Sequence, residues 1–318
     1  VAKGIVYAVG IQMAGPIVRN LVVAHWFDRF RGRALGFSVM GASIAGVVLP
    51  LVLNELVNMY GWRTTVYLFA IVVFGVLVPV TMFILRDKPA DIGEIRDGRQ
   101  NQGDTVEESA KVAADNAEPW SWAQLLRSRS LWACGLTFGP MVCVYIVMMV
   151  HLFGHVVDSG LEKSQAAMIL SVLAFTSIVG KPIIGTMADK FGARITLWIS
   201  LAAQATAMVG FVMADSFVTF AIAAMIHGVG YAAVSSIRTY ALSRAFGIKS
   251  LGSSMGLLRW IELPFASVAS PLAGFIYDAT GSYDNALLIL AVFLTIAGVG
   301  PFFIDNKNSS GAKETAPK

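Results

Sequence analysis

Nine apolar stretches, each long enough to cross a bilayer as a helix, occupy most of this chain. A hydrocarbon core of about 30 Å requires roughly 20 apolar residues in a helix. The stretches are 4–26, 33–56, 64–85, 131–156, 164–186, 195–213, 218–242, 251–275 and 283–304. Only 14% of the residues are charged, well below the roughly 25% of soluble domains. The pattern predicts an all-α integral membrane protein with about nine transmembrane helices, most of them joined by short turns and therefore antiparallel to their neighbours.

One long polar segment, 86–130, divides these stretches into three before it and six after it. The segment is too polar to build a buried core, so it is predicted to be a linker between two membrane lobes. We expect the remainder of an N-terminal lobe over 1–85, a cytoplasmic linker over 86–130, a six-helix C-terminal lobe over 131–304 and a cytoplasmic tail over 305–318. Near the linker's end, Trp120 and Trp122 predict a short amphipathic helix at the membrane surface.

Basic residues gather on one side of the predicted membrane segments. If the loop at 27–32 is cytoplasmic, alternation places seventeen of the 24 Lys and Arg residues on that side and three on the other. This positive-inside asymmetry predicts a multi-pass protein of the cell membrane with a cytoplasmic C-terminus. It also explains the net charge of +4 without a nucleic-acid partner.

A glycine-rich charged turn follows the fifth stretch, with the pattern Gly185-x-x-x-Asp189-Lys190-x-Gly192-x-Arg194. This turn resembles the cytoplasmic loop motif of the major facilitator superfamily. The segments 26–36, 61–63, 151–160 and 274–283 resemble the monocarboxylate transporter and oxalate–formate antiporter branches of that superfamily.

This resemblance implies the major facilitator fold, with two six-helix lobes, a central cavity and alternating access to the two sides of the membrane. Its substrates would be organic anions, often small carboxylates. Nine helices would correspond to the fourth to twelfth of twelve, so we expect the first three to be missing before Val1. The sequence contains no HExxH or GxxxxGK[ST] motif, so we expect no enzymatic activity. We also expect no cofactor and a monomer.

A lysine within the fifth stretch, Lys181, is a candidate substrate contact. A charge at this depth is costly unless it faces a cavity or a partner. It precedes Pro182, where the resemblance implies an arginine for the substrate carboxylate. The alternative is that Lys181 extends to the cytoplasmic edge beside Asp189. The branch also implies an aspartate where this chain has Ser177, which leaves proton symport and anion exchange both open.

Arg259 and Glu262 lie three residues apart on the eighth stretch and therefore share a helix face. Arg259 is a candidate substrate cation, and Glu262 is its partner or a proton carrier; alternatively the two only neutralise each other. Arg238 is expected on the same face as Tyr231, seven residues earlier, either lining the cavity or reaching the interface. Tyr145 is expected to line the cavity or pack in the core.

Four cations within the predicted spans, including Arg19, outnumber the single buried anion Glu262. This excess favours an anionic ligand. Together with the resemblance, which implies a transporter of small carboxylates, this excess leads us to expect a secondary active transporter of small monocarboxylates or dicarboxylates, by proton symport or by anion exchange. The alternative is an exporter of drugs or other hydrophobic molecules.

The remaining candidates concern gating. Asp189 is expected to cap the following helix or to bond to charges across the lobe interface, and Lys190 and Arg194 are expected to pair with acidic groups on neighbouring helix ends. Such contacts would hold the inward face closed in one state and break in the other. The alternative is a simple basic anchor. His151 is a candidate pH-sensitive outer gate or an ordinary interfacial residue, and we expect no metal site. Gly36, Gly41 and Gly46 are expected to allow close helix approach.

Overall fold

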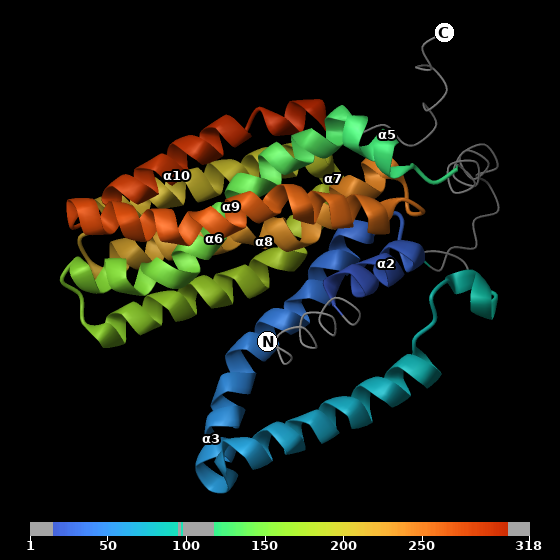
Figure 1. Ribbon diagram of the computed structural model, residues 1–318, viewed down its shortest axis with the longest axis horizontal. Coiled ribbons are helices and arrows are strands. Elements are labelled where there is room, and N and C mark those ends of the chain that lie inside the picture. The colour runs from blue at the N-terminus through green and yellow to red at the C-terminus, as the bar shows by residue number, and fades with distance from the viewer. Residues whose placement is uncertain (1–14, 95–96, 98–117, 305–318) are drawn as a thin grey trace.

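The computed structural model describes residues 15–94, 97 and 118–304, and all regular structure in this part of the chain is helical (Figure 1). The α-helices are α2 (Pro16–Trp26), α3 (Arg31–Pro79), α5 (Trp122–Arg127), α6 (Arg129–Asp158), α7 (Lys163–Met213), α8 (Phe217–Phe246), α9 (Leu251–Thr280) and α10 (Asp284–Ala297). Short π and 3-10 segments cover Val80–Ile84, Pro89–Ile92 and Gly300–Phe303. The predicted all-α fold is confirmed. The middle of the predicted linker (95–96 and 98–117), the start of the first predicted span and the predicted C-terminal tail lie outside the described residues.

Two of the helices, α3 and α7, each contain two of the predicted spans. Gly61 breaks α3 with φ 75° and Gly192 breaks α7 with φ 80°, conformations that glycine adopts without a side-chain clash. Five segments of the described chain are long and apolar enough to cross a membrane: Glu55–Ile84, Arg129–Asp158, Lys163–Met213, Phe217–Phe246 and Asp284–Phe303. Gly61 lies between the predicted spans 33–56 and 64–85, and Gly192 lies between the predicted spans 164–186 and 195–213. The glycine breaks thus mark where one predicted span ends and the next begins.

Helices α6 to α10 form a packed bundle, and α2 with the first part of α3 lies against it (Figure 1). Large buried side chains of the bundle core include Phe138, Phe211 and Phe220. The second part of α3 stands away from the bundle, and none of the 18 residues in the apolar window within Glu55–Ile84 is buried. The candidate site is therefore built from α6 to α9 and from their contacts with α2 and the first part of α3.

The short helix α5 lies where the sequence predicted an amphipathic helix. Ser121 caps it, accepting from the N–H of Gln124, whose side chain accepts in return from the Ser121 N–H. Trp120 packs edge-on against Phe246 and donates its backbone N–H to Ser250, whereas Trp122 is 63% exposed. One tryptophan thus anchors α5 to the bundle, and the other remains available for the predicted membrane surface.

Candidate functional site

Five of the residues singled out in the sequence meet between three helices. Tyr145 comes from α6, Tyr231 and Arg238 from α8, and Arg259 and Glu262 from α9. The spacing of seven residues on α8 and of three on α9 places each pair on one helix face. Because α6 packs against both α8 and α9, these faces converge.

Glu262 lies between the two arginines and contacts one with each oxygen. Its Oε1 is 3.1 Å from Nε of Arg238, and its Oε2 accepts from Nη1 of Arg259 at 3.5 Å. The side chains of Glu262 and Arg238 are 3% and 7% exposed, whereas that of Arg259 is 51% exposed. In this group of three, which we call the arginine cluster, two guanidinium groups share a single carboxylate, and only Arg259 presents its charge to open space.

The closer contact in the arginine cluster is an ion pair without hydrogen-bond geometry. Among the described residues, Arg238 Nε and Glu262 Oε1 have no hydrogen-bond partner although both atoms are buried. Buried charged groups normally satisfy their hydrogen-bonding capacity. The pair therefore keeps unused capacity for a ligand or for a rearranged contact.

Aromatic rings border the arginine cluster. Tyr145 and Tyr231 stack with ring centroids 4.5 Å apart and nearly parallel planes. The Arg238 guanidinium lies 5.6 Å from the centroid of the Phe138 ring. Phe138 is fully buried and packs against Arg238 within the bundle core. The tyrosine pair thus forms an aromatic surface beside the cations, an arrangement suited to a small ligand with an apolar body and an anionic end.

Lys181 belongs to a different group of residues. It is 4% exposed and donates from Nζ to the hydroxyl of Ser43, which lies on α3. Arg19 of α2 is near enough to interact with it electrostatically. Lys181 therefore joins α7 to α3 instead of extending to Asp189 and the cytoplasmic edge. Ser43 was not a candidate in the sequence, where it is an ordinary small polar residue among apolar ones.

Asp189 lies in the turn between two predicted spans and joins α7 to the start of α3. Its carboxylate accepts the backbone N–H of Gly32 at 2.7 Å and that of Arg33 at 2.9 Å. A carboxylate at this position also matches the positive end of the helix dipole. Burial raises the pKa of Asp189 above its ordinary value, although these two hydrogen bonds oppose the shift. Asp189 belongs to α7, which follows the linker, and it caps α3, which precedes the linker.

The same crossing requires glycine on both helices. A Cβ on Gly32 would clash with the carbonyl oxygen of Gly185, and a Cβ on Gly185 would clash with that of Gly32. A Cβ on Gly36 would lie 2.5 Å from the carbonyl oxygen of Lys181. The backbones of α3 and α7 are therefore in direct contact between the Asp189 cap and Lys181.

Further polar contacts join α2 and α3 to the bundle. Arg31 donates to the hydroxyl of Ser243 at 3.1 Å and pairs with the nearby Asp28 at 3.0 Å. Asn20 of α2 donates to Thr239 of α8 at 2.8 Å. Sequence reasoning missed the Arg31–Ser243 and Asn20–Thr239 pairs because more than 200 residues separate the partners of each.

Arg194 and Lys190 differ from Asp189 in their surroundings. Arg194 donates to the backbone carbonyl oxygens of Pro301, Phe302 and Ile304. It therefore binds the end of the last helical segment of the described chain. Lys190 is exposed.

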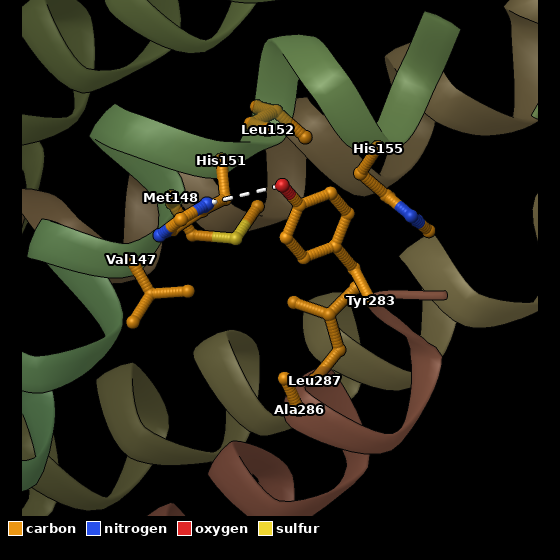
Figure 2. Close-up of a pocket in the computed structure, with 8 residues that line it drawn as sticks. All are labelled: Val147, Met148, His151, Leu152, His155, Tyr283, Ala286 and Leu287. Atoms are coloured by element: carbon orange, nitrogen blue, oxygen red, sulfur yellow. Dashed lines mark hydrogen bonds between the residues drawn. The ribbon is translucent and has the colours of Figure 1, made fainter. Parts of the chain in front are cut away.

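His151 lies near the opposite end of α6 from the linker, in a small pocket with Tyr283 (Figure 2). Its ring nitrogens lie 3.2 Å from the Tyr283 hydroxyl and 3.0 Å from the Ser270 hydroxyl. His155 has a different partner: its Nε2 lies 3.1 Å from the backbone carbonyl oxygen of Phe211. Within the described residues, no group of three His, Cys, Asp or Glu side chains is arranged to hold a metal ion.

Known proteins resemble this chain in both sequence and fold. Monocarboxylate transporter 13 of Rattus norvegicus is 23% identical over 288 residues, and monocarboxylate transporter 2 of Homo sapiens is 20% identical over 292. Each alignment covers 87% of this chain and 60% of the relative, so the chain spans about 60% of the length of these transporters.

A solved structure shares the fold. The E. coli fucose–proton symporter FucP superposes with a TM-score of 0.63 at 16% identity, over 91% of this chain and 72% of FucP. The sequence profile of the Major Facilitator Superfamily matches residues 5–162 and 153–318. The chain therefore belongs to the Major Facilitator Superfamily of multi-pass membrane transporters, and it is related to the monocarboxylate transporters.

Proposed function

We propose that this protein is a secondary active transporter of small organic anions that works by alternating access. The observation that carries this proposal is the excess of cations in the arginine cluster, where Arg238 and Arg259 share the single carboxylate of Glu262. An uncompensated positive charge within a membrane protein favours an anionic partner. The stacked Tyr145–Tyr231 pair supplies an aromatic surface for the ligand body.

In this proposal the contacts between α3 and α7 form the gate, which we call the Asp189 gate. Asp189 holds the start of α3, and Lys181 reaches Ser43 across the same interface. Opening this end requires both contacts to separate, together with the Arg31–Ser243 bond. Substrate bound by Lys181 would replace the Ser43 hydroxyl with a carboxylate oxygen, which makes a stronger partner for an ammonium group.

The sidedness of the gate and the coupling group belong to the same proposal. The Asp189 gate lies at the end that carries most of the basic residues, so we assign it to the cytoplasmic side of the cell membrane. Glu262 is the candidate coupling group because its carboxylate contacts both arginines. Proton symport would neutralise it, and anion exchange would leave it ionised.

Uptake into proteoliposomes tests this function. The reconstituted protein is compared with Lys181→Ala and Arg259→Ala on a panel of labelled monocarboxylates and dicarboxylates. We expect saturable uptake by the wild type and a decrease of about tenfold to a hundredfold in each variant, the effect of losing one charged hydrogen-bonding group. Uptake driven by an imposed proton gradient would indicate symport. Uptake driven by an anion preloaded into the proteoliposomes would indicate exchange.

Exposed basic residues near the same helices provide matched controls. Lys163→Ala at the start of α7 and Lys249→Ala just before α9 each remove a charge outside the site, since both side chains are exposed. We expect uptake like that of the wild type. A wild type inactive on every carboxylate, or a fully active Lys181→Ala and Arg259→Ala, would contradict the anion proposal and favour export of hydrophobic molecules.

A further inference from the structure

The first residues of the linker fold back onto the loop between α2 and α3. Trp26, at the end of α2, donates from its indole Nε1 to the backbone carbonyl oxygen of Arg86 at 2.9 Å. Oδ2 of Asp97 accepts the backbone N–H of Asp28 at 3.0 Å and that of Arg29 at 2.7 Å. Two separate points near the start of the linker therefore hold the α2–α3 loop.

The loop that Asp97 holds also carries contacts to the bundle. The carboxylate of Asp28 pairs with Arg31 at 3.0 Å and lies 3.9 Å from Nη1 of Arg244 on α8. Arg31 in turn donates to the hydroxyl of Ser243, which is also on α8. Because Asp28 binds the linker through its backbone and faces α8 with its side chain, the positions of the linker and of α8 are coupled at this residue.

Two carboxylates bind neighbouring N–H groups of this loop and of the start of α3. Asp97 accepts those of residues 28 and 29 from the linker, and Asp189 accepts those of Gly32 and Arg33 from α7. N–H groups at a helix N-terminus have no acceptor within the helix, so a carboxylate from elsewhere is an effective partner. The Asp189 gate therefore has a matching contact on the linker side, which we call the Asp97 latch.

The Asp97 latch combines favourable and unfavourable contributions. Its two hydrogen bonds to a charged acceptor are favourable. Against them, Oδ1 of Asp97 is buried without a hydrogen-bond partner among the described residues, and Asp97 has a left-handed backbone with φ 59°. A buried unsatisfied oxygen and a left-handed backbone each cost free energy. Because these costs offset part of the gain, the contact is suited to release during a transport cycle.

We propose that Asp97 is a positioning residue of the cytoplasmic gate. It keeps the α2–α3 loop against α8 while this end is closed, and it releases the loop when the end opens. This inference rests on the proposed function, from which it takes the Asp189 gate, and it adds the linker to the gating machinery. The simpler alternative is that Asp97 only folds the start of the linker.

The experiment measures how often the cytoplasmic end opens, without any substrate. Ser243 is 4% exposed and lies against Arg31, so a cysteine at this position should react with a soluble maleimide only when the end opens. All variants carry Ser243→Cys, and labelling rates are recorded for the full chain in detergent. Cys134 and Cys143 are buried and provide a low background. We expect Asp97→Ala to be labelled about tenfold faster than the Ser243→Cys parent, since two hydrogen bonds to a carboxylate are lost.

Two further variants separate the latch from a general effect on the linker. Asp97→Asn keeps one acceptor oxygen for the N–H groups but removes the charge, so its labelling rate should lie between those of the parent and of Asp97→Ala. Asp91→Ala is the matched control, because the carboxylate of Asp91 is exposed and accepts the N–H of Lys88, within the linker itself, at 3.1 Å. We expect Asp91→Ala to be labelled at the rate of the parent.

Hydrogen exchange of the peptide 27–36 reports on the contact itself. Faster exchange together with faster labelling in Asp97→Ala supports the latch. Faster exchange with labelling at the rate of the parent overturns the gating role and leaves Asp97 as a residue that folds the linker. Unchanged exchange overturns the contact, whatever the labelling rate.

The remaining outcomes also decide. Equally fast labelling of Asp97→Ala and Asp91→Ala assigns the effect to the linker as a whole and overturns the role of Asp97. If Asp97→Ala fails to fold, Asp97→Asn replaces it: labelling faster than Asp91→Ala supports the latch, and labelling at the same rate overturns it. Because labelling requires no substrate, a protein that follows these rates but transports no carboxylate keeps the latch and overturns the anion proposal. A protein that transports carboxylates, with labelling unchanged by Asp97→Ala, does the reverse.

Discussion

At the scale of single residues, the carboxylate of Asp189 is the acceptor that fixes the start of α3. It receives the backbone N–H groups of Gly32 and Arg33, which the helix itself leaves without an acceptor. We expect Asp189→Ala to speed amide exchange at the start of α3 by about tenfold to a hundredfold, since two N–H groups lose their partner. Hydrogen exchange of the peptide 27–36, followed by mass spectrometry, measures this change.

Asp215→Ala, which removes an exposed carboxylate from a loop, is the control. Equal exchange of the peptide 27–36 in both variants would refute the contact between Asp189 and the start of α3.

The pH dependence of stability separates the acceptor role of Asp189 from its charge. Burial raises the pKa of Asp189, so the folded protein binds this proton more tightly than the unfolded chain does. Its contribution to stability is therefore fully present at acidic pH, below the unfolded pKa, and is lost as pH rises through the raised pKa. Asp189→Asn should lose this pH dependence and keep one acceptor for the N–H groups. Melting temperatures in detergent across the acidic range measure it, and identical pH profiles for Asp189→Asn and wild type would contradict the raised pKa.

At the scale of helices, three glycines of α3 that look alike in sequence have different surroundings. A Cβ on Gly36 would meet the α7 backbone, whereas a Cβ on Gly41 or Gly46 would have no neighbour within 4 Å among the described residues. Gly36→Ala must push α3 away from α7, at a cost of about 1–3 kcal/mol. We expect a lower melting temperature in detergent for this variant.

Gly41→Ala is the matched control on the same helix. It adds the same methyl group in open space and favours helix formation by up to about 1 kcal/mol, so its melting temperature should equal or exceed that of the wild type. Equal destabilisation by both substitutions would mean that α3 and α7 do not cross as closely as described. The spacing of glycines along α3 makes all three candidates for close helix packing. Only the position of α7, which is distant in sequence, decides that glycine is required at Gly36.

At the scale of the whole molecule, hydrophobic length and turn residues were sufficient to predict the helices. Local signals such as Gly61 and Gly192 also marked the breaks between spans. The pairing of Arg238 with Glu262 could not be derived, since the two residues lie on different helices and spacing reports neighbours only within one helix. The Lys181–Ser43 contact and the backbone partners of Asp189 were missed for the same reason. The excess of cations, the charged turn and the pairs that share one helix face, such as Arg259 with Glu262, were visible in the sequence.

The orientation of the whole molecule in the membrane gives the last prediction. Lys249 lies in the α8–α9 connection, whereas Asp215 lies in the α7–α8 connection at the other end of α8, and both are exposed. The native thiols, Cys134 and Cys143, are buried and provide a low background. If the basic end faces the cytoplasm, an impermeant maleimide should label Asp215→Cys in intact cells and Lys249→Cys only after permeabilisation. The opposite labelling would place the Asp189 gate outside the cell, and the same contacts would then close the outer face of the transporter.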